Sequence, residues 1–155
     1  MPFTAVPLRG TEAVRTRLPA GTKRALLARL AAIGEALTGS GREAILHALV
    51  EREKAGTTGL GGGIAMPHGR LEGLGEVTGF FARLASPVSY EALDGQPVDL
   101  VFTILSPPDA GVEHLKALAA VSRALRDQEV TAKLRGARSR DAVFALLTGG
   151  DPGEP

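Results

Sequence analysis

The chain has 155 residues, 44% of them hydrophobic and 23% charged, which is the length and composition of one globular domain. Eighteen basic residues balance seventeen acidic ones, which argues against a nucleic-acid partner, because nucleic-acid-binding domains carry a clustered basic excess. The absence of cysteine excludes disulfides and thiol chemistry, and without a visible signal peptide or an apolar stretch long enough to span a bilayer we expect a cytoplasmic protein that is not membrane-embedded.

The first half of the chain predicts two helices after an irregular start. Residues 1–20 contain three prolines and predict an irregular segment with one short extended piece. From Thr22, leucine and isoleucine recur at spacings of three and four residues, which predicts a helix that ends near Thr38. A second helix is expected to begin at Ser40, which with Glu43 has the spacing of a capping box, and to end before the glycine run.

The second half alternates strands and helices. Strands are predicted at residues 63–66, 77–84 and 98–105, and helices at 112–127, 130–134 and from Ser139 onward. The run 98–105 is almost continuously apolar between two prolines, which is typical of a central strand covered on both faces. The inward side of the helix over 112–127 is expected to carry Leu115, Leu118, Val121, Ser122 and Leu125.

Helices on either side of a run of strands predict an α/β fold in which helices flank the sheet on both faces. We expect a single domain over residues 1–150 and a flexible C-terminal tail over residues 151–155.

The segment Gly56–Arg70 joins a glycine run to one histidine, His68, between Pro67 and Gly69. The glycines are not followed by the Lys-Ser/Thr pair of a nucleotide-binding P-loop. They follow a helix and precede a strand, which is the reverse of a dinucleotide-binding loop. Because a neutral imidazole is available near pH 7, His68 is a candidate nucleophile or ligand.

The other histidines and two arginines remain open on the residues alone. A structural role is favoured for His47, in the middle of a helix, whereas His114 lies near a helix N-terminus, where anions are favoured, and suits a structural or a functional role equally. Arg52 and Arg70 have the guanidinium geometry that matches phosphate oxygens. No cluster with metal-ligand spacing and no Gly-x-Ser-x-Gly motif occurs, so no metal site or serine hydrolase is predicted.

Three segments in order resemble the phosphotransferase-system EIIA domains of the fructose/mannitol type. They are the active-site segment Arg52–Gly69, the central-strand segment Asp94–Phe102 and the second-histidine segment His114–Leu118. The resemblance extends over about residues 10–148 and is greatest to the nitrogen-regulatory EIIA-Ntr (PtsN) branch. It implies a mixed β-sheet with helices on both sides.

The resemblance also implies roles for three residues. His68 would accept a phosphoryl group from an HPr/NPr-like phosphohistidine protein, His114 would hydrogen-bond that group, and Arg52 would stabilise its charge. Amides of the glycine loop are expected to share the phosphoryl oxygens. The donor is a phosphohistidine rather than a nucleotide, so no magnesium ion or other cofactor is expected.

Two functions fit this resemblance. In the first, the chain is a regulatory phosphocarrier whose phosphorylation state controls nitrogen- or potassium-related target proteins. In the alternative, it is a separately encoded sugar-transport EIIA subunit that passes phosphate to an EIIB domain. A non-catalytic binding module of the same fold is disfavoured, because His68, His114 and Arg52 occur together.

Overall fold

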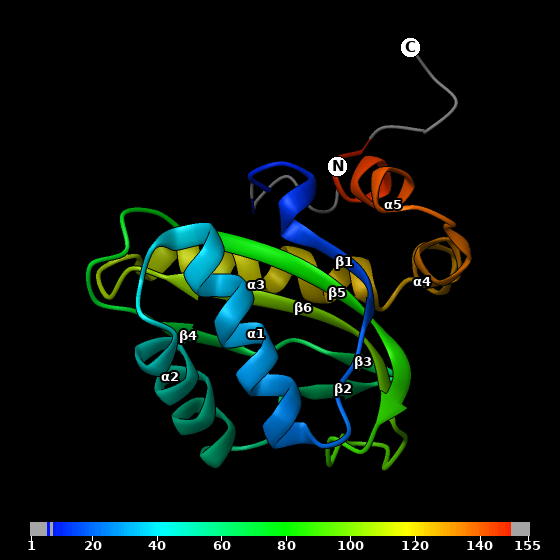
Figure 1. The fold of residues 1–155 in the computed structure, drawn as a ribbon, viewed down its shortest axis with the longest axis horizontal. Helices are drawn as coiled ribbons and strands as arrows, with labels where there is room; N and C mark the ends of the chain where they lie inside the picture. Colours follow the sequence, from blue (N-terminus) through cyan, green and yellow to red (C-terminus); the bar gives the residue numbers. More distant parts are fainter. Residues whose placement is uncertain (1–5, 7, 150–155) are drawn as a thin grey trace.

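A mixed six-stranded sheet forms the centre of the structure, a computed structural model that describes residues 6 and 8–149 (Figure 1). Its strands are β1 (Val14–Leu18), β2 (Gly59–Gly61), β3 (Ile64–Ala65), β4 (His68–Arg70), β5 (Thr78–Val88) and β6 (Val98–Ser106). The helices are α1 (Lys23–Thr38), α2 (Arg42–Lys54), α3 (Gly111–Leu125), α4 (Gln128–Gly136) and α5 (Arg140–Leu147), and a 3₁₀ turn, Thr11–Ala13, precedes β1. The predicted single-domain α/β fold with a mixed sheet is confirmed.

Strand β6 is the central strand, as its apolar sequence predicts. It pairs antiparallel with β5 on one side and parallel with both β3 and β4 on the other, in the order β1-β5-β6-β3-β2. Every residue of β6 except Asp99 is buried. A strand covered on both faces needs apolar side chains pointing both ways, which explains the continuous apolar run.

Each face of the sheet has its own apolar core. Helices α1 and α2 cover one face, where Phe80 of β5 is fully buried. Helices α3, α4 and α5 pack on the other face, where Phe81 of the same strand and Phe102 of β6 are fully buried (Figure 1). Successive strand side chains point to opposite faces, so the Phe-Phe pair contributes one ring to each core.

The first residues of three helices show how each helix is capped. The Thr22 hydroxyl accepts a hydrogen bond from the Ala25 amide at 3.1 Å, and Ser139 caps α5 in the same way. The capping box predicted at Ser40 is wrong, because Gly41 is the N-cap residue and makes no side-chain cap. The carboxylate of Glu35 instead accepts from the Arg42 amide at 2.9 Å, so the end of α1 caps the start of α2.

The glycine run, expected to be a loop, forms the β2–β3 hairpin. Strand β2 pairs antiparallel with β3, and the turn between them has φ values of +100°, +66° and +83° at Gly61, Gly62 and Gly63. These are left-handed backbone angles that other residues adopt only with strain, so the glycines are needed for the turn itself.

The buried stripe of α3 contains Val121 and Leu125, as predicted, but not Leu115. Its inward residues include His114, Ala117 and Val121, at spacings of three and four, while Leu115 is 64% exposed. Leu115 is next to His114, about 100° around the helix, so it cannot share the face that holds the histidine. Leu118 is half-buried and packs against the core of that face. The predicted tail, 151–155, lies outside the described residues.

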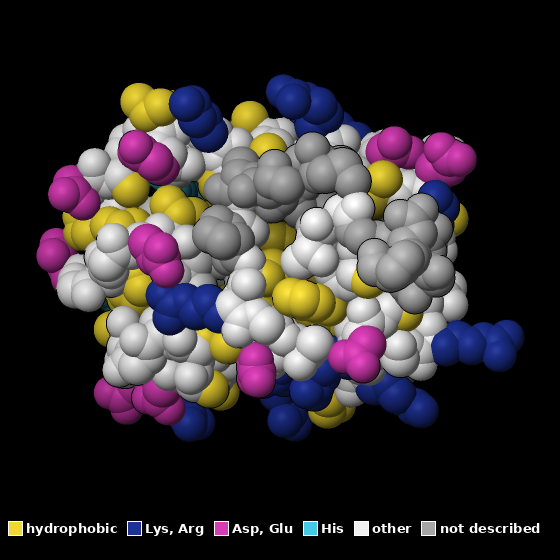
Figure 2. Space-filling view, turned by 90° about the horizontal axis from the view of Figure 1, so that it is seen from above, with side chains coloured by type: hydrophobic (Ala, Val, Ile, Leu, Met, Phe, Trp, Pro, Cys, Tyr) yellow, Lys and Arg dark blue, Asp and Glu magenta, His cyan; other side chains and the backbone are white. Residues whose placement is uncertain are grey.

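The surface shows no large region of one charge on the face seen from above, where basic and acidic side chains lie among one another (Figure 2). Within the described ranges, no helix is long and apolar enough to cross a membrane.

Candidate functional site

Four elements, β4, β6, α2 and α3, meet around His68 near one end of β6. Strand β4 runs parallel to β6, which places His68 beside Ile104 and Arg70 beside Ser106. The Ile104 amide donates to the carbonyl oxygen of Pro67 at 3.1 Å, which fixes the chain just before the histidine. Helix α3 follows β6 after a short turn and carries His114 in its first turn.

Helix α2 packs directly against β4 and completes the site. A Cβ atom added at Gly69 would lie 3.1 Å from the Cβ atom of Ala48, which is a tight contact, so glycine at this position favours the close approach of strand and helix. The last turn of α2 then brings Arg52 beside the histidine.

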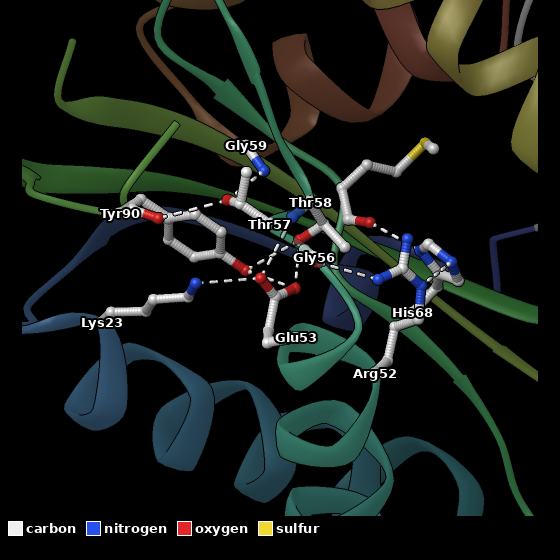
Figure 3. Close-up of polar contacts among 10 residues, drawn as sticks. Lys23, Arg52, Glu53, Gly56, Thr57, Thr58, Gly59, His68 and Tyr90 are labelled. Carbon is white, nitrogen blue, oxygen red and sulfur yellow. Dashed lines mark hydrogen bonds and ion pairs between the residues drawn. The ribbon is translucent and has the colours of Figure 1, made fainter. Parts of the chain in front are cut away.

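Both ring nitrogens of His68 have hydrogen-bond partners (Figure 3). Nδ1 lies 2.9 Å from the Met66 carbonyl oxygen, and Nε2 lies 3.1 Å from Nε of Arg52. A carbonyl only accepts and a guanidinium only donates, so Nδ1 bears the hydrogen and Nε2 presents its lone pair. The site therefore holds a neutral imidazole with a lone pair on Nε2, which is the form that a nucleophile requires.

Arg52 spans the gap between His68 and the end of α2. Besides its bond to His68, its Nη1 donates to the carbonyl oxygen of Gly56 at 2.9 Å. In this arrangement the Arg52 Nε–H occupies the lone pair of His68 Nε2. An electrophile reaches that lone pair only after the guanidinium has moved aside.

His114 is the second imidazole of the site. It is only 6% exposed, its ring centroid lies 5.8 Å from that of His68, and the two ring planes are inclined at 55°. Its Nδ1 lies 2.6 Å from Oγ of Ser106, the last residue of β6. The structure thus brings His68, Arg52 and His114 together, as the sequence predicts.

Both histidines are held in the neutral form. Burial is the largest cause that lowers the pKa of His68, and the Arg52 charge adds to it, while the hydrogen bond to Met66 and the charge of Glu53 oppose it. Burial also lowers the pKa of His114, followed by the charges of Arg70 and His68. Uncharged imidazoles at pH 7 suit a nucleophile and a hydrogen-bond donor.

A buried polar network around Glu53 was missed by the sequence analysis (Figure 3). Arg52 and Glu53 are adjacent on α2 but reach in opposite directions, the first to His68 and the second to Lys23 and Tyr90. The carboxylate of Glu53 lies 3.0 Å from Nζ of Lys23, and it accepts a hydrogen bond from the Tyr90 hydroxyl at 3.2 Å. Burial, then the charge of Glu53, raises the pKa of Tyr90, so its hydroxyl keeps its proton.

The network supports the backbone that positions His68. Glu53 accepts hydrogen bonds from both the amide and the hydroxyl of Thr58, and the Thr58 carbonyl accepts from the Met66 amide at 3.0 Å. The Met66 carbonyl oxygen in turn accepts a hydrogen bond from Nδ1 of the His68 ring. Lys23 and Tyr90 are 30 or more positions from Glu53 in sequence, so no local pattern revealed the network.

Replacing Glu53 by glutamine is expected to lower the free energy of unfolding by about 3 kcal/mol, because it leaves a largely buried Lys23 without its charged partner. Chemical denaturation measures the loss. Glu51→Gln is the matched control, since Glu51 forms an exposed ion pair with Lys54 on the same helix and exposed pairs contribute little. Equal losses in the two variants would contradict the structural importance of the network.

The remaining sequence candidates lie apart from this centre or at its edge. The expectation that the glycine-loop amides share the phosphoryl oxygens fails for Gly62, whose amide donates to the Asp94 carboxylate at 2.9 Å, in the turn at the far end of β3 from His68. The same turn borders a cavity of about 740 Å³ beside α4. His47 is exposed on α2, and Arg70 donates to the Pro108 carbonyl at 3.2 Å near His114.

In the part of the chain that the structure describes, no three His, Asp or Glu side chains are grouped so that they would hold a metal ion.

Comparison with known proteins identifies the family of the chain. A family model described as the EIIA 2 component of the phosphoenolpyruvate-dependent sugar phosphotransferase system matches residues 9–149. The chain belongs to this family.

The chain is similar both to nitrogen regulatory proteins and to a sugar-specific EIIA component. A nitrogen regulatory protein of Bradyrhizobium diazoefficiens is 46% identical over 147 residues, which are 95% of each chain. A fructose-specific EIIA component of Haloferax volcanii is 42% identical over 106 residues, 68% of this chain and 69% of that protein. The crystal structure of the nitrogen regulatory protein IIA-Ntr of Neisseria meningitidis superposes with a TM-score of 0.85 at 32% identity, over 92% of this chain and 96% of that one.

Proposed function

We propose that this EIIA 2 protein is a phosphocarrier that accepts a phosphoryl group on Nε2 of His68 from the phosphohistidine of an HPr/NPr-like protein. The observation that supports it most is the pair of hydrogen bonds on His68, because they fix the proton on Nδ1 and the lone pair on Nε2. Membership of the EIIA 2 family supports the phosphocarrier role independently.

The transfer is a single in-line displacement. The lone pair of His68 Nε2 forms a bond to phosphorus while the bond from phosphorus to the donor's ring nitrogen breaks, and its electron pair returns to the donor imidazole. No proton has to move, because His68 keeps its hydrogen on Nδ1. The Met66 carbonyl, 2.9 Å away, stabilises the positive charge that the phosphorylated ring acquires.

Arg52 and His114 stabilise the phosphoryl oxygens in this scheme. The Arg52 guanidinium leaves the Nε2 lone pair and turns its N–H groups to the incoming group, and a guanidinium matches phosphate oxygens well. His114, with its ring 5.8 Å from that of His68, lies within reach of the same oxygens through its free ring nitrogen. Positioning and charge stabilisation are most of what phosphoryl transfer requires.

A partner protein has an apolar surface to dock on beside the site. Val112 and Leu115 are 61% and 64% exposed on the first turns of α3, on either side of His114. Large exposed apolar side chains next to a reactive group favour an interface with another protein.

The proposed role in the cell is regulatory, with the phosphorylation state of His68 governing the binding of nitrogen- or potassium-related target proteins. The 46% identity to a nitrogen regulatory protein over 95% of both chains favours this role. The alternative, a sugar-transport subunit that passes phosphate to an EIIB domain, is favoured by the fructose-specific relative.

The test supplies purified enzyme I, an HPr-like or NPr-like carrier and labelled phosphoenolpyruvate, and locates the label by peptide mapping. We expect label on His68 and no transfer onward to a fructose-type EIIB domain. Label on another residue would contradict the phosphocarrier proposal, whereas rapid transfer to EIIB would replace the regulatory role by the transport role.

The rate of His68 phosphorylation is expected to be flat around pH 7 and to fall only below pH 6.5. A protonated imidazole has no lone pair, and burial lowers the pKa of His68 below its ordinary value of 6.5. Single-turnover transfer from a pre-phosphorylated carrier across pH measures the midpoint. A midpoint at or above 6.5 would contradict the burial of His68 in the reactive state.

The same pKa shifts predict how stability depends on pH. In the folded protein, His68 and His114 have pKa values below their ordinary value of 6.5. At pH values between these lowered pKa values and 6.5, the unfolded chain binds more protons than the folded one. The free energy of unfolding therefore decreases as the pH falls through this range.

A further inference from the structure

Ser106 is a buried hydroxyl with a single partner in the site. It is 0% exposed at the end of β6, and its Oγ lies 2.6 Å from Nδ1 of His114. Across residues 6 and 8–149, this is the one hydrogen bond that the Ser106 side chain makes. Buried polar groups are nearly always hydrogen-bonded, so this contact has to satisfy both atoms.

The direction of the hydrogen bond follows from counting hydrogens. If Nδ1 of His114 were the donor, the hydroxyl hydrogen of Ser106 would be buried with no acceptor. If the hydroxyl is the donor, its hydrogen and the Nδ1 lone pair are both satisfied. Ser106 therefore donates, and a neutral His114 bears its hydrogen on Nε2.

We propose that Ser106 is a positioning residue that holds His114 in the Nε2–H tautomer, so that His114 offers the phosphoryl oxygens a donor and not a lone pair. The inference rests on the proposed function in one respect, namely that a phosphoryl group arrives at His68. The tautomer itself is a property of the free protein.

The two histidines then have complementary tautomers. His68 has its hydrogen on Nδ1, against the Met66 carbonyl, and keeps a nucleophilic Nε2. His114 has its hydrogen on Nε2 because Ser106 occupies Nδ1. With the opposite tautomer, a lone pair of His114 would face the phosphoryl oxygens and repel them. Because lowered pKa values keep both rings neutral, the tautomer of each ring determines which of its nitrogens donates a hydrogen bond and which presents a lone pair.

A Ser–His pair also occurs in hydrolases, where the serine is the nucleophile. That function does not fit Ser106, because a fully buried hydroxyl cannot reach a substrate. Its partner, His114, is also buried, whereas His68 is half-buried and is the more accessible histidine of the site.

The variant Ser106→Ala tests the proposal, and Thr103→Val is its matched control. Thr103 is also fully buried on β6, but its hydroxyl has no hydrogen-bond partner in the described residues. Two-bond ¹H–¹⁵N NMR spectra of the imidazole groups identify the tautomer of His114 at pH 7.5 without any phosphoryl donor.

We expect the Nε2–H tautomer in the wild type and in Thr103→Val, and a mixture of tautomers in Ser106→Ala. Phosphorylation of His68 should slow about tenfold in Ser106→Ala, since a lost orienting hydrogen bond costs of that order. In a His114→Gln background, which has no tautomer to set, Ser106→Ala should slow transfer no further.

An Nδ1–H tautomer in the wild type, an unchanged tautomer in Ser106→Ala, or an unchanged transfer rate in that variant would each overturn the proposal. A wild type that accepts no phosphoryl group would overturn the proposed function instead, and the NMR spectra would still decide which nitrogen Ser106 controls.

Discussion

The variant His68→Gln is expected to take up no phosphoryl group from a phosphorylated HPr-like or NPr-like carrier, while wild-type protein becomes labelled. Glutamine keeps a polar side chain of similar reach but has no nucleophilic ring nitrogen, so the loss is complete rather than partial. Acid-labile, base-stable incorporation of ³²P measures it, because those stabilities distinguish phosphohistidine from phosphoserine.

His47→Gln is the control for this loss. It makes the same substitution on the exposed surface of α2 and should leave labelling unchanged. Circular dichroism of both variants shows whether the fold is intact. Full labelling of His68→Gln would mean that another residue accepts the phosphoryl group.

Arg52→Gln is expected to slow phosphoryl transfer by a factor of about 10²–10³, the usual cost of losing a donor to developing negative charge. In the structure, Arg52 Nε donates to His68 Nε2 at 3.1 Å, and in the proposed transfer the same guanidinium turns to the phosphoryl oxygens. Single-turnover kinetics with increasing donor concentration separates a loss in the transfer step from weaker donor binding.

Arg42→Gln is the matched control for Arg52→Gln. Arg42 lies at the other end of α2 and pairs with Glu35, so its loss removes a guanidinium from the same helix without touching the site. We expect less than a twofold change there. If the two variants transfer phosphate at similar rates, Arg52 does not stabilise the phosphoryl group.

Most of the fold could be predicted because its elements have strong local signals. The apolar run of β6 and the leucine periodicity of α1 each specify one type of element, and Ser139 caps its helix as expected. The errors are where a tertiary contact overrides a local pattern. Glu35 replaces the predicted capping box at Ser40.

The glycine run is a second place where a tertiary contact overrides the local sequence pattern. Glycine tolerates many backbone conformations, so its sequence favours a loop, but pairing with β3 turns Gly59–Gly61 into a strand. In α3, leucine at position 115 suggests a core residue, yet the face turned to the sheet is set by His114 and Ala117.

The site could be predicted only in part. His68, Arg52 and His114 were found through motifs that resemble a family, and the structure places the three side chains together. Ser106 and the Glu53 network have no such signal, because each depends on residues brought together by the sheet. Ser106 lies just beyond the predicted strand 98–105 and belongs to no motif, so only its position 2.6 Å from His114 Nδ1 reveals its role.

The most direct test of the account is the position of the phosphoryl group on the ring of His68. Phosphorylated, ¹⁵N-histidine-labelled protein gives ¹H–¹⁵N spectra in which the phosphorylated and the protonated ring nitrogen are distinguished. We predict phosphorus on Nε2 and the hydrogen on Nδ1, still bound to the Met66 carbonyl. Phosphorus on Nδ1, or on either nitrogen of His114, would contradict the account.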